Sequence, residues 1–399
     1  MKKGLAIVLA ALLLAGVLVW PRARTTWALS KARVAVQAKD CPGVLSALDG
    51  ISAAGVDGQF VHEARAYCLL QSKQWQRVHD EASASLAIAP GSVQALKLRF
   101  TASRELGRDA DAEEDLGRLI SAEPNSLTWR EARAELRAER HAWEAAIEDA
   151  DAVLAADPKH VGALDVRMHA WHALGNWENA YRDVVALLEV KPSVVRYRDA
   201  ADLAIPLSRL DDADGYMAAA LAEAPDDLEL NILACRLRVA HTEAPDAGAA
   251  EADAALRECE RTAKRAPGHA PTHRRYGRML LQRGELQLAL AEADAAVGIR
   301  PSSALAHKLR ADVLLAQKKP AEALAAAQDG LTAAATDDEV VAGAAEAGLL
   351  QTRAEALLAL RRDDEARADL EKALTLLPED DTDVATVKQK LSALGRSKR

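Results

Sequence analysis

The sequence predicts an all-α fold: a solenoid of antiparallel helix pairs preceded by a hydrophobic N-terminal helix. Three observations lead to this prediction. Prolines recur about every 34 residues, apart from one gap of two repeats, at Pro90, Pro124, Pro158, Pro192, Pro225, Pro267, Pro301 and Pro378. Twelve residues before each proline stands an alanine, with one valine as the exception, and aromatic residues make up only 4% of a chain rich in alanine and leucine. A fixed period of this length indicates a repeat array, and the composition favours helices.

The first 24 residues form a separate segment. Lys2 and Lys3 precede an uncharged apolar run of 17 residues, 4–20, which spans roughly 25 Å as a helix and is at the short limit for crossing a bilayer. A cleaved signal peptide is the alternative interpretation, but no small-x-small motif follows the run. We therefore expect residues 1–24 to be an uncleaved transmembrane signal anchor. Basic residues on both sides of the run leave its orientation open.

Residues 161–194 show how one repeat folds. Apolar residues at helical spacing end at Gly175, where glycine adopts the left-handed conformation without cost. Trp177 then begins a second helix and is expected to cover the turn, and Ala180 is small enough for the two helices to cross closely. Pro192 ends the pair, because its ring cannot continue the helical hydrogen bonds.

This repeat resembles the tetratricopeptide repeat (TPR). The family pattern has a small residue at repeat position 8, glycine near 15, an aromatic residue near 17, alanine at 20 and proline at 32. The repeat at 270–303 follows this pattern at Gly277, Gly284, Leu286, Ala289, Ala296 and Pro301. The resemblance implies that the α-solenoid is right-handed. It also implies a non-enzymatic scaffold that binds protein or peptide partners, with the first helices of the repeats lining a concave groove.

The resemblance covers nearly all of 25–380, in about ten repeats. They are 25–58, 59–92, 93–126, 127–160, 161–194, 195–227, 228–269, 270–303, 304–346 and 347–380. The first repeat is degenerate, the seventh carries an insertion near 241–252, and another insertion lies near 335–346. Residues 381–399 are expected to form a capping helix and a basic tail.

Four cysteines permit two disulfides. In the repeat phase, Cys41 and Cys68 lie on neighbouring antiparallel helices, and Cys235 and Cys259 lie on the facing sides of the two helices of one repeat. Both links would place the array in an oxidising compartment. The alternative is four small buried apolar side chains.

Outward positions of the first helices are the predicted partner-binding groove. They are acidic in the middle of the chain and basic toward the C-terminus, at Glu131, Glu135, Glu139, Asp165, His169, His172, Arg236, Arg274, Arg278 and Lys308. Such a gradient can steer and align a partner of opposite polarity. The alternative is an ordinary solvated helix surface.

Several functions find no support in the sequence. The formal net charge is −9, and because residues 1–24 carry +4 the rest carries −13, which opposes general nucleic-acid binding. Asparagines do not have the arrangement of the carboxylate clamp of chaperone-binding TPR proteins. His169 and His172 share a helical face, but a polar groove surface explains them better than a metal site. No catalytic motif or phosphate loop is present, so we predict no enzyme activity, cofactor, metal or small-molecule substrate.

Two functional interpretations remain. The first is a membrane-anchored scaffold on the extracytoplasmic, periplasmic side of a bacterial-type envelope, assisting assembly of an envelope, secretion or cytochrome-maturation complex. The second is a cytoplasm-facing, membrane-anchored regulatory subunit of an enzyme complex. Paired cysteines favour the first interpretation and free thiols the second.

Overall fold

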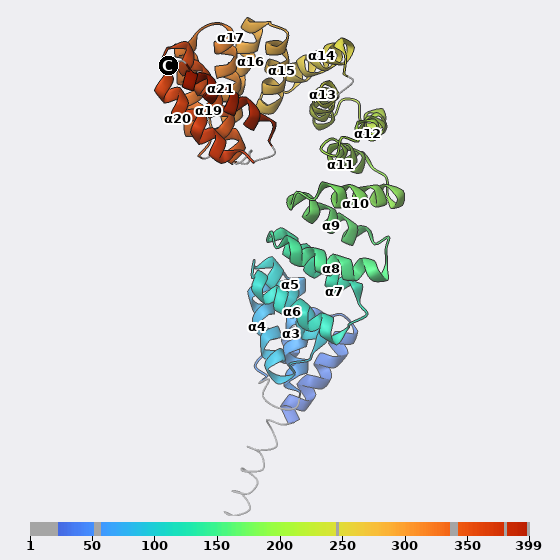
Figure 1. Ribbon diagram of the computed structural model, residues 1–399. Helices are drawn as coiled ribbons and strands as arrows, with labels where there is room; N and C mark the ends of the chain where they lie inside the picture. Colours follow the sequence, from blue (N-terminus) through green and yellow to red (C-terminus); the bar gives the residue numbers. More distant parts are fainter. Residues whose placement is uncertain (1–22, 52–56, 245–246, 336–341, 379–380, 397–399) are drawn as a thin grey trace, which may run out of the picture. The chain divides into compact units, whose positions relative to one another are not determined.

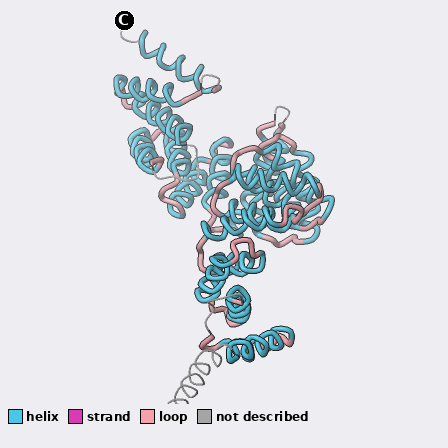
Figure 2. Tube along the Cα trace, turned by 90° about the horizontal axis from the view of Figure 1, so that it is seen from below, coloured by secondary structure: helices cyan, strands magenta, loops and turns pink. Residues whose placement is uncertain are grey.

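The computed structural model describes the chain except for residues 1–22, 52–56, 245–246, 336–341, 379–380 and 397–399, and every element in the described part is helical (Figures 1 and 2). The chain divides into two compact units with the boundary between Lys191 and Pro192. The predicted anchor, 1–24, falls almost wholly outside the described residues. Within the described residues, no helix is both long and apolar enough to cross a membrane.

The described residues of the N-terminal unit form five successive helix pairs. We call the first helix of a pair the A helix and the second the B helix. The pairs are a helix over 23–37 with α2 (Cys41–Leu48), α3 (Gly58–Gln71) with α4 (Trp75–Ile88), α5 (Val93–Glu105) with α6 (Asp109–Ala122), α7 (Leu127–Glu139) with α8 (Trp143–Ala156), and α9 (Val161–Ala173) with α10 (Trp177–Val190).

The C-terminal unit continues the pattern and ends with one additional helix. Its pairs are α11 (Val194–Ala204) with α12 (Leu210–Glu223), α13 (Leu228–Thr242) with α14 (Ala249–Arg265), α15 (Ala270–Gln282) with α16 (Leu286–Ile299), α17 (Ala304–Ala316) with α18 (Pro320–Ala333), and α19 (Ala342–Ala359) with α20 (Asp363–Leu376). The last helix, α21 (Thr382–Arg396), covers the apolar end of the array by packing Val387 and Leu394 against Leu370 and its neighbours.

The predicted alanine phase marks the helix crossings. Ala180 is fully buried, and so are the residues at the same repeat position, Val78, Ala112, Ala146, Ala213, Ala255, Ala289 and Ala366. Gly277 makes a similar close approach on an A helix, because an added Cβ would lie 2.9 Å from a methyl carbon of Leu309. Small residues therefore let neighbouring helices touch, which is the role that the sequence predicts for them.

The turn between the two helices is left-handed in nearly every pair, with or without glycine. Gly107, Gly175 and Gly284 adopt positive φ at repeat position 15. Non-glycine residues adopt the same conformation in the other tight turns, at Lys39, Lys73, His141, Ser208, Lys318 and Arg361. The turn geometry is thus a property of the fold, and only some repeats have the residue that adopts it without strain. The α13–α14 pair is joined by residues 243–248, of which 245–246 lie outside the described residues, and the seventh-repeat insertion near 241–252 reaches into the ends of both helices.

Both predicted cysteine pairs are joined. Cys41 at the start of α2 is linked to Cys68 in α3, with their Cα atoms 5.1 Å apart. Cys235 in α13 is linked to Cys259 in α14, with their Cα atoms 4.8 Å apart. The first disulfide connects consecutive repeats and the second connects the two helices of one repeat, as the repeat phase predicts.

Candidate functional site

One stripe of each A helix faces away from its B helix. Repeat positions 2, 5, 9 and 12 lie on this stripe, because three- and four-residue steps return to the same side of a helix. In the C-terminal unit, α13 and α15 are neighbours, and so are α15 and α17 (Figure 1). Their stripes therefore form adjoining parts of one surface, on which two hollows lie.

The first hollow has a volume of about 340 Å³ and lies over α11, α13 and the start of α15. Its charges are balanced, since three arginines face three carboxylates: Arg198, Arg236, Arg275, Asp199, Asp202 and Glu229. Arg236 donates a hydrogen bond to Asp202, and Arg198 lies 2.9 Å from the carboxylate of Asp199. Arg236 was expected in the groove, and in the structure the carboxylate of Asp202 compensates its charge.

The second hollow has a volume of about 250 Å³ and is lined only by α15 and α17. It brings together three residues expected in the groove, Arg274, Arg278 and Lys308, and adds Arg275, which also lines the first hollow. Three leucines and Asp312 complete the lining. The second hollow is thus an apolar depression with a basic rim.

The predicted acidic stripe lies on α7 in the N-terminal unit. Glu139 accepts two hydrogen bonds from Arg104, at 2.6 and 2.9 Å, and this contact lowers the pKa of its carboxyl. Glu131 lies against Gly162 of α9, where an added Cβ would overlap its carboxylate. Between them, burial raises the pKa of Glu135, and the neighbouring carboxylates of Glu131 and Glu139 add to that shift.

Three expected groove residues lie on α9. Asp165 is half-buried, whereas His169 and His172 are exposed. The rings of His172 and Trp177 pack edge to face with centroids 5.1 Å apart, and both side chains are exposed. In the described part of the chain, no group of histidine, cysteine, aspartate and glutamate side chains is arranged to hold a metal ion.

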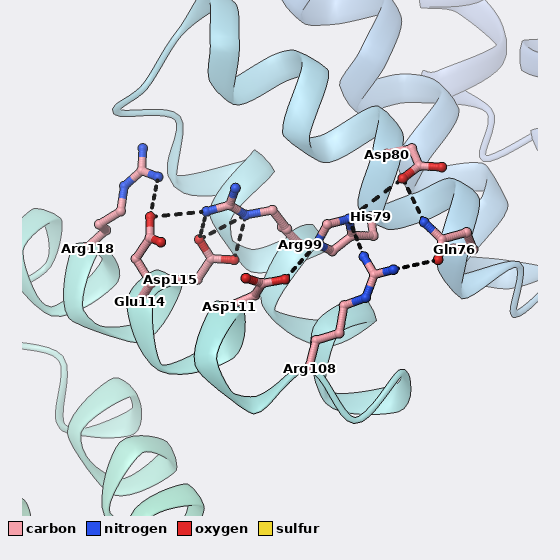
Figure 3. Close-up of polar contacts among 9 residues, drawn as sticks. All are labelled: Gln76, His79, Asp80, Arg99, Arg108, Asp111, Glu114, Asp115 and Arg118. Atoms are coloured by element: carbon pink, nitrogen blue, oxygen red, sulfur yellow. Dashed lines mark hydrogen bonds and ion pairs between the residues drawn. The ribbon is translucent and has the colours of Figure 1, made fainter.

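A recurrent buried ion pair was not predicted. An arginine at repeat position 7 of the A helix binds an aspartate at position 23 of the B helix, in the pairs Arg99–Asp115, Arg133–Asp149, Arg167–Asp183 and Arg353–Asp369. All four aspartates are buried. Figure 3 shows the first pair, in which two guanidinium nitrogens of Arg99 donate to Asp115 at 2.6–3.1 Å. The 34-residue spacing of Arg99, Arg133 and Arg167 is the signal that could have revealed these pairs.

These pairs stabilise the helix crossing and do not belong to the exposed face. The hydrogen bond with Asp115 raises the pKa of Arg99, so the guanidinium stays charged. Burial raises the pKa of Asp115, and the contact with Arg99 opposes that shift. In two of the four pairs a second carboxylate extends the contact, Glu114 near Arg99 and Asp151 at 2.5 Å from Arg167. A charge-assisted, bidentate contact of this kind fixes the register of the two helices.

Comparison with known proteins gives a fold but no family assignment. No protein-family model matches the chain. A curated relative, the DnaJ homolog subfamily C member 7 homolog of Schizosaccharomyces pombe, is 28% identical over 159 residues, which cover 38% of this chain and 33% of the relative. The chain thus spans about a third of the length of that relative.

Solved structures share the arrangement of the helices. A human IFIT1 dimer with m7Gppp-AAAA is similar with a TM-score of 0.51 at 13% identity, over 85% of this chain and 82% of that one. The TPR domain of P58(IPK) gives a TM-score of 0.41 at 15% identity, over 94% of this chain and 99% of that one. These likenesses concern the fold alone. The described residues form an array of TPR-like helical repeats.

Proposed function

We propose that this protein is a non-enzymatic scaffold that binds an extended segment of a partner protein along the A helices of its C-terminal unit. TPR-like folds are typical of protein-interaction scaffolds, although a fold does not name the partner. The observation that carries the proposal is the pair of adjoining hollows, which share Arg275 and follow successive A helices. An extended peptide can place successive side chains in such hollows.

Photocrosslinking in cells tests this proposal. A photoreactive amino acid at Leu305 or Arg278 on the A-helix face should crosslink the same partner protein. The same group at exposed B-helix positions, Leu288 on α16 and Lys264 on α14, serves as the control. Crosslinks of equal yield from both faces, or none from the A-helix face, would contradict binding at this surface.

For the cellular setting we propose a membrane anchor at 1–24 and an array on the extracytoplasmic side, in assembly of an envelope, secretion or cytochrome-maturation complex. Two disulfides support this setting, because such bonds persist in oxidising compartments. The apolar run 4–20 supports the anchor. The alternative, a cytoplasm-facing regulatory subunit, requires reduced thiols.

The redox state of the cysteines in cells separates the two settings. Protein from native membranes is alkylated before and after reduction, and its peptides are weighed. The extracytoplasmic proposal expects Cys41 linked to Cys68 and Cys235 linked to Cys259. Four thiols alkylated before reduction would favour the cytoplasmic alternative.

A further inference from the structure

We propose that the second hollow, between α15 and α17, recognises an acidic linear segment of the partner by taking up one apolar side chain flanked by carboxylates. This inference rests on the proposed function, since it names the chemistry of the partner at the same face. The evidence is the contrast between the apolar interior of the hollow, its basic rim and the balanced charges of the first hollow.

The interior of the hollow accepts an apolar side chain. Leu281, Leu305 and Leu309 line it from both helices. Leu309 is buried in the core between α15 and α17, whereas Leu281 and Leu305 are only partly buried. A ligand side chain that covers the two partly buried leucines removes their remaining apolar surface from water, which favours binding.

The rim selects carboxylates. Four cationic side chains, Arg274, Arg275, Arg278 and Lys308, line the hollow with a single carboxylate, that of Asp312. Arg275 also lines the first hollow, so the cations of this hollow alone are Arg274, Arg278 and Lys308, which outnumber its one carboxylate. Lys308 contacts that carboxylate at 2.8 Å, and the lining as a whole keeps an excess of positive charge. A bound carboxylate is attracted by that excess, and charge-assisted hydrogen bonds from guanidinium groups are among the stronger polar contacts.

The contacts that the rim makes now are easy to exchange. Arg278 lies 3.0 Å from Glu243, but their side chains are 48% and 64% exposed. Exposed ion pairs of this kind contribute little free energy. A partner carboxylate can therefore replace Glu243 at Arg278 without leaving a buried charge unpaired.

The lining favours a peptide over RNA. Proteins that bind single-stranded nucleic acid commonly stack bases on aromatic side chains. The eight residues that line the second hollow include no aromatic side chain. Three carboxylates line the adjoining first hollow and would repel a phosphate backbone.

Fluorescence polarisation with the purified full chain in detergent tests the inference. The probes are fluorescein-labelled nonapeptides with a central leucine, methionine or phenylalanine and two carboxylates on each side. Their analogues carry amides in place of the carboxylates, or a central alanine. We expect at least one acidic apolar peptide to bind about tenfold or more tightly than both of its analogues.

Matched variants connect the binding to this hollow. Arg278→Glu and Lys308→Glu should each weaken the peptide about tenfold or more, whereas Lys264→Glu on α14 changes the net charge equally and should have no effect. Leu305→Ala should weaken the peptide, whereas Leu288→Ala on the exposed face of α16 should not. Circular dichroism of each variant shows whether its helices are intact.

The inference is wrong if acidic peptides bind no more tightly than their amide analogues, or if Arg278→Glu and Lys308→Glu bind them as the unaltered chain does. Binding of a 5′-triphosphorylated RNA nonamer that Arg278→Glu abolishes, without peptide binding, would assign the hollow to RNA instead. Persistent crosslinks from the A-helix face with no peptide selectivity would remove the acidic motif and leave the scaffold proposal intact.

Discussion

Two helix pairs stabilise the equivalent crossing of their helices by different chemistry. In the α9–α10 pair of the N-terminal unit, Arg167 at repeat position 7 holds Asp183 at position 23, with nitrogen–oxygen distances of 2.6 and 2.8 Å. In the α13–α14 pair of the C-terminal unit, Cys235 and Cys259 form a disulfide one residue further along each helix. Where the other pair has its arginine, the α13–α14 pair has Ala234, and Glu258 turns to Arg261 of its own helix.

The connections between the helices also differ in the two pairs. Gly175 closes the α9–α10 pair with a tight turn at φ 72°. The α13–α14 pair has longer helices, of 15 and 17 residues, and more residues between them, 243–248. A longer connection leaves more conformational freedom to the unfolded chain, which a covalent link across 24 residues restricts. One crossing thus depends on buried charge and the other on redox state.

The largest expected effect comes from leaving one buried charge alone. Arg167→Ala removes the guanidinium and leaves Asp183, which is 2% exposed, without its partner. We expect the α9–α10 pair to lose about 3–5 kcal/mol of stability, because an uncompensated buried charge is costly. Hydrogen exchange of the amides in α9 and α10 measures the loss.

The double variant Arg167→Met with Asp183→Leu separates charge from packing. It removes both charges and fills the crossing with apolar side chains, so we expect most of the stability to return. Unchanged hydrogen exchange of α9 and α10 in Arg167→Ala would mean that the ion pair does not stabilise the crossing of these helices.

Removing the disulfide should have the next largest effect. We expect Cys235→Ala with Cys259→Ala to destabilise the α13–α14 pair by about 2–3 kcal/mol, since the link restricts the unfolded chain. Urea unfolding and hydrogen exchange of α13 and α14 measure this. Reductant should reproduce the loss in the unaltered chain and leave exchange in α9–α10 unchanged. An equal response of both pairs to reductant would contradict the comparison.

Sequence reasoning finds the elements that repeat in residue type. Ala180 and Pro192 keep a fixed phase, so helix pairs and both cysteine links can be predicted from them. The ion pairs keep the same phase, yet sequence reasoning places Arg167 and Asp183 on the surface because charged side chains are seldom buried. The left-handed turn at Lys318 cannot be predicted, since lysine has no preference for positive φ. Hollows depend on how neighbouring A helices pack, which the pattern of a single repeat does not determine.

A third contact between paired helices, in the α15–α16 pair, should contribute stability that depends on pH. His273 contacts Glu292, at position 23, with Nδ1 and Oε2 2.6 Å apart, and this hydrogen bond raises the pKa of the histidine. The pKa of His273 is therefore higher in the folded state than in the unfolded state, where it is near 6.5. The contact with Glu292 stabilises the fold fully below the unfolded pKa, and this stabilisation is lost as pH rises through the folded pKa. His273→Gln should therefore cost more stability at pH 5.5 than at pH 8.5. An equal cost at both pH values, measured by thermal unfolding, would exclude this linkage.

The smallest effects should come from the turns. Lys318 holds φ at 60° in the tight turn between α17 and α18, and its side chain is exposed. We expect Lys318→Gly to stabilise this pair by about 0.5–1 kcal/mol, because glycine relieves the left-handed strain at the cost of a more flexible unfolded chain. Gly175→Ala should destabilise α9–α10 by about 1 kcal/mol for the same reason. Hydrogen exchange of the two pairs compares the changes, and a loss of stability in both variants would show that side-chain contacts, and not backbone conformation, decide these turns.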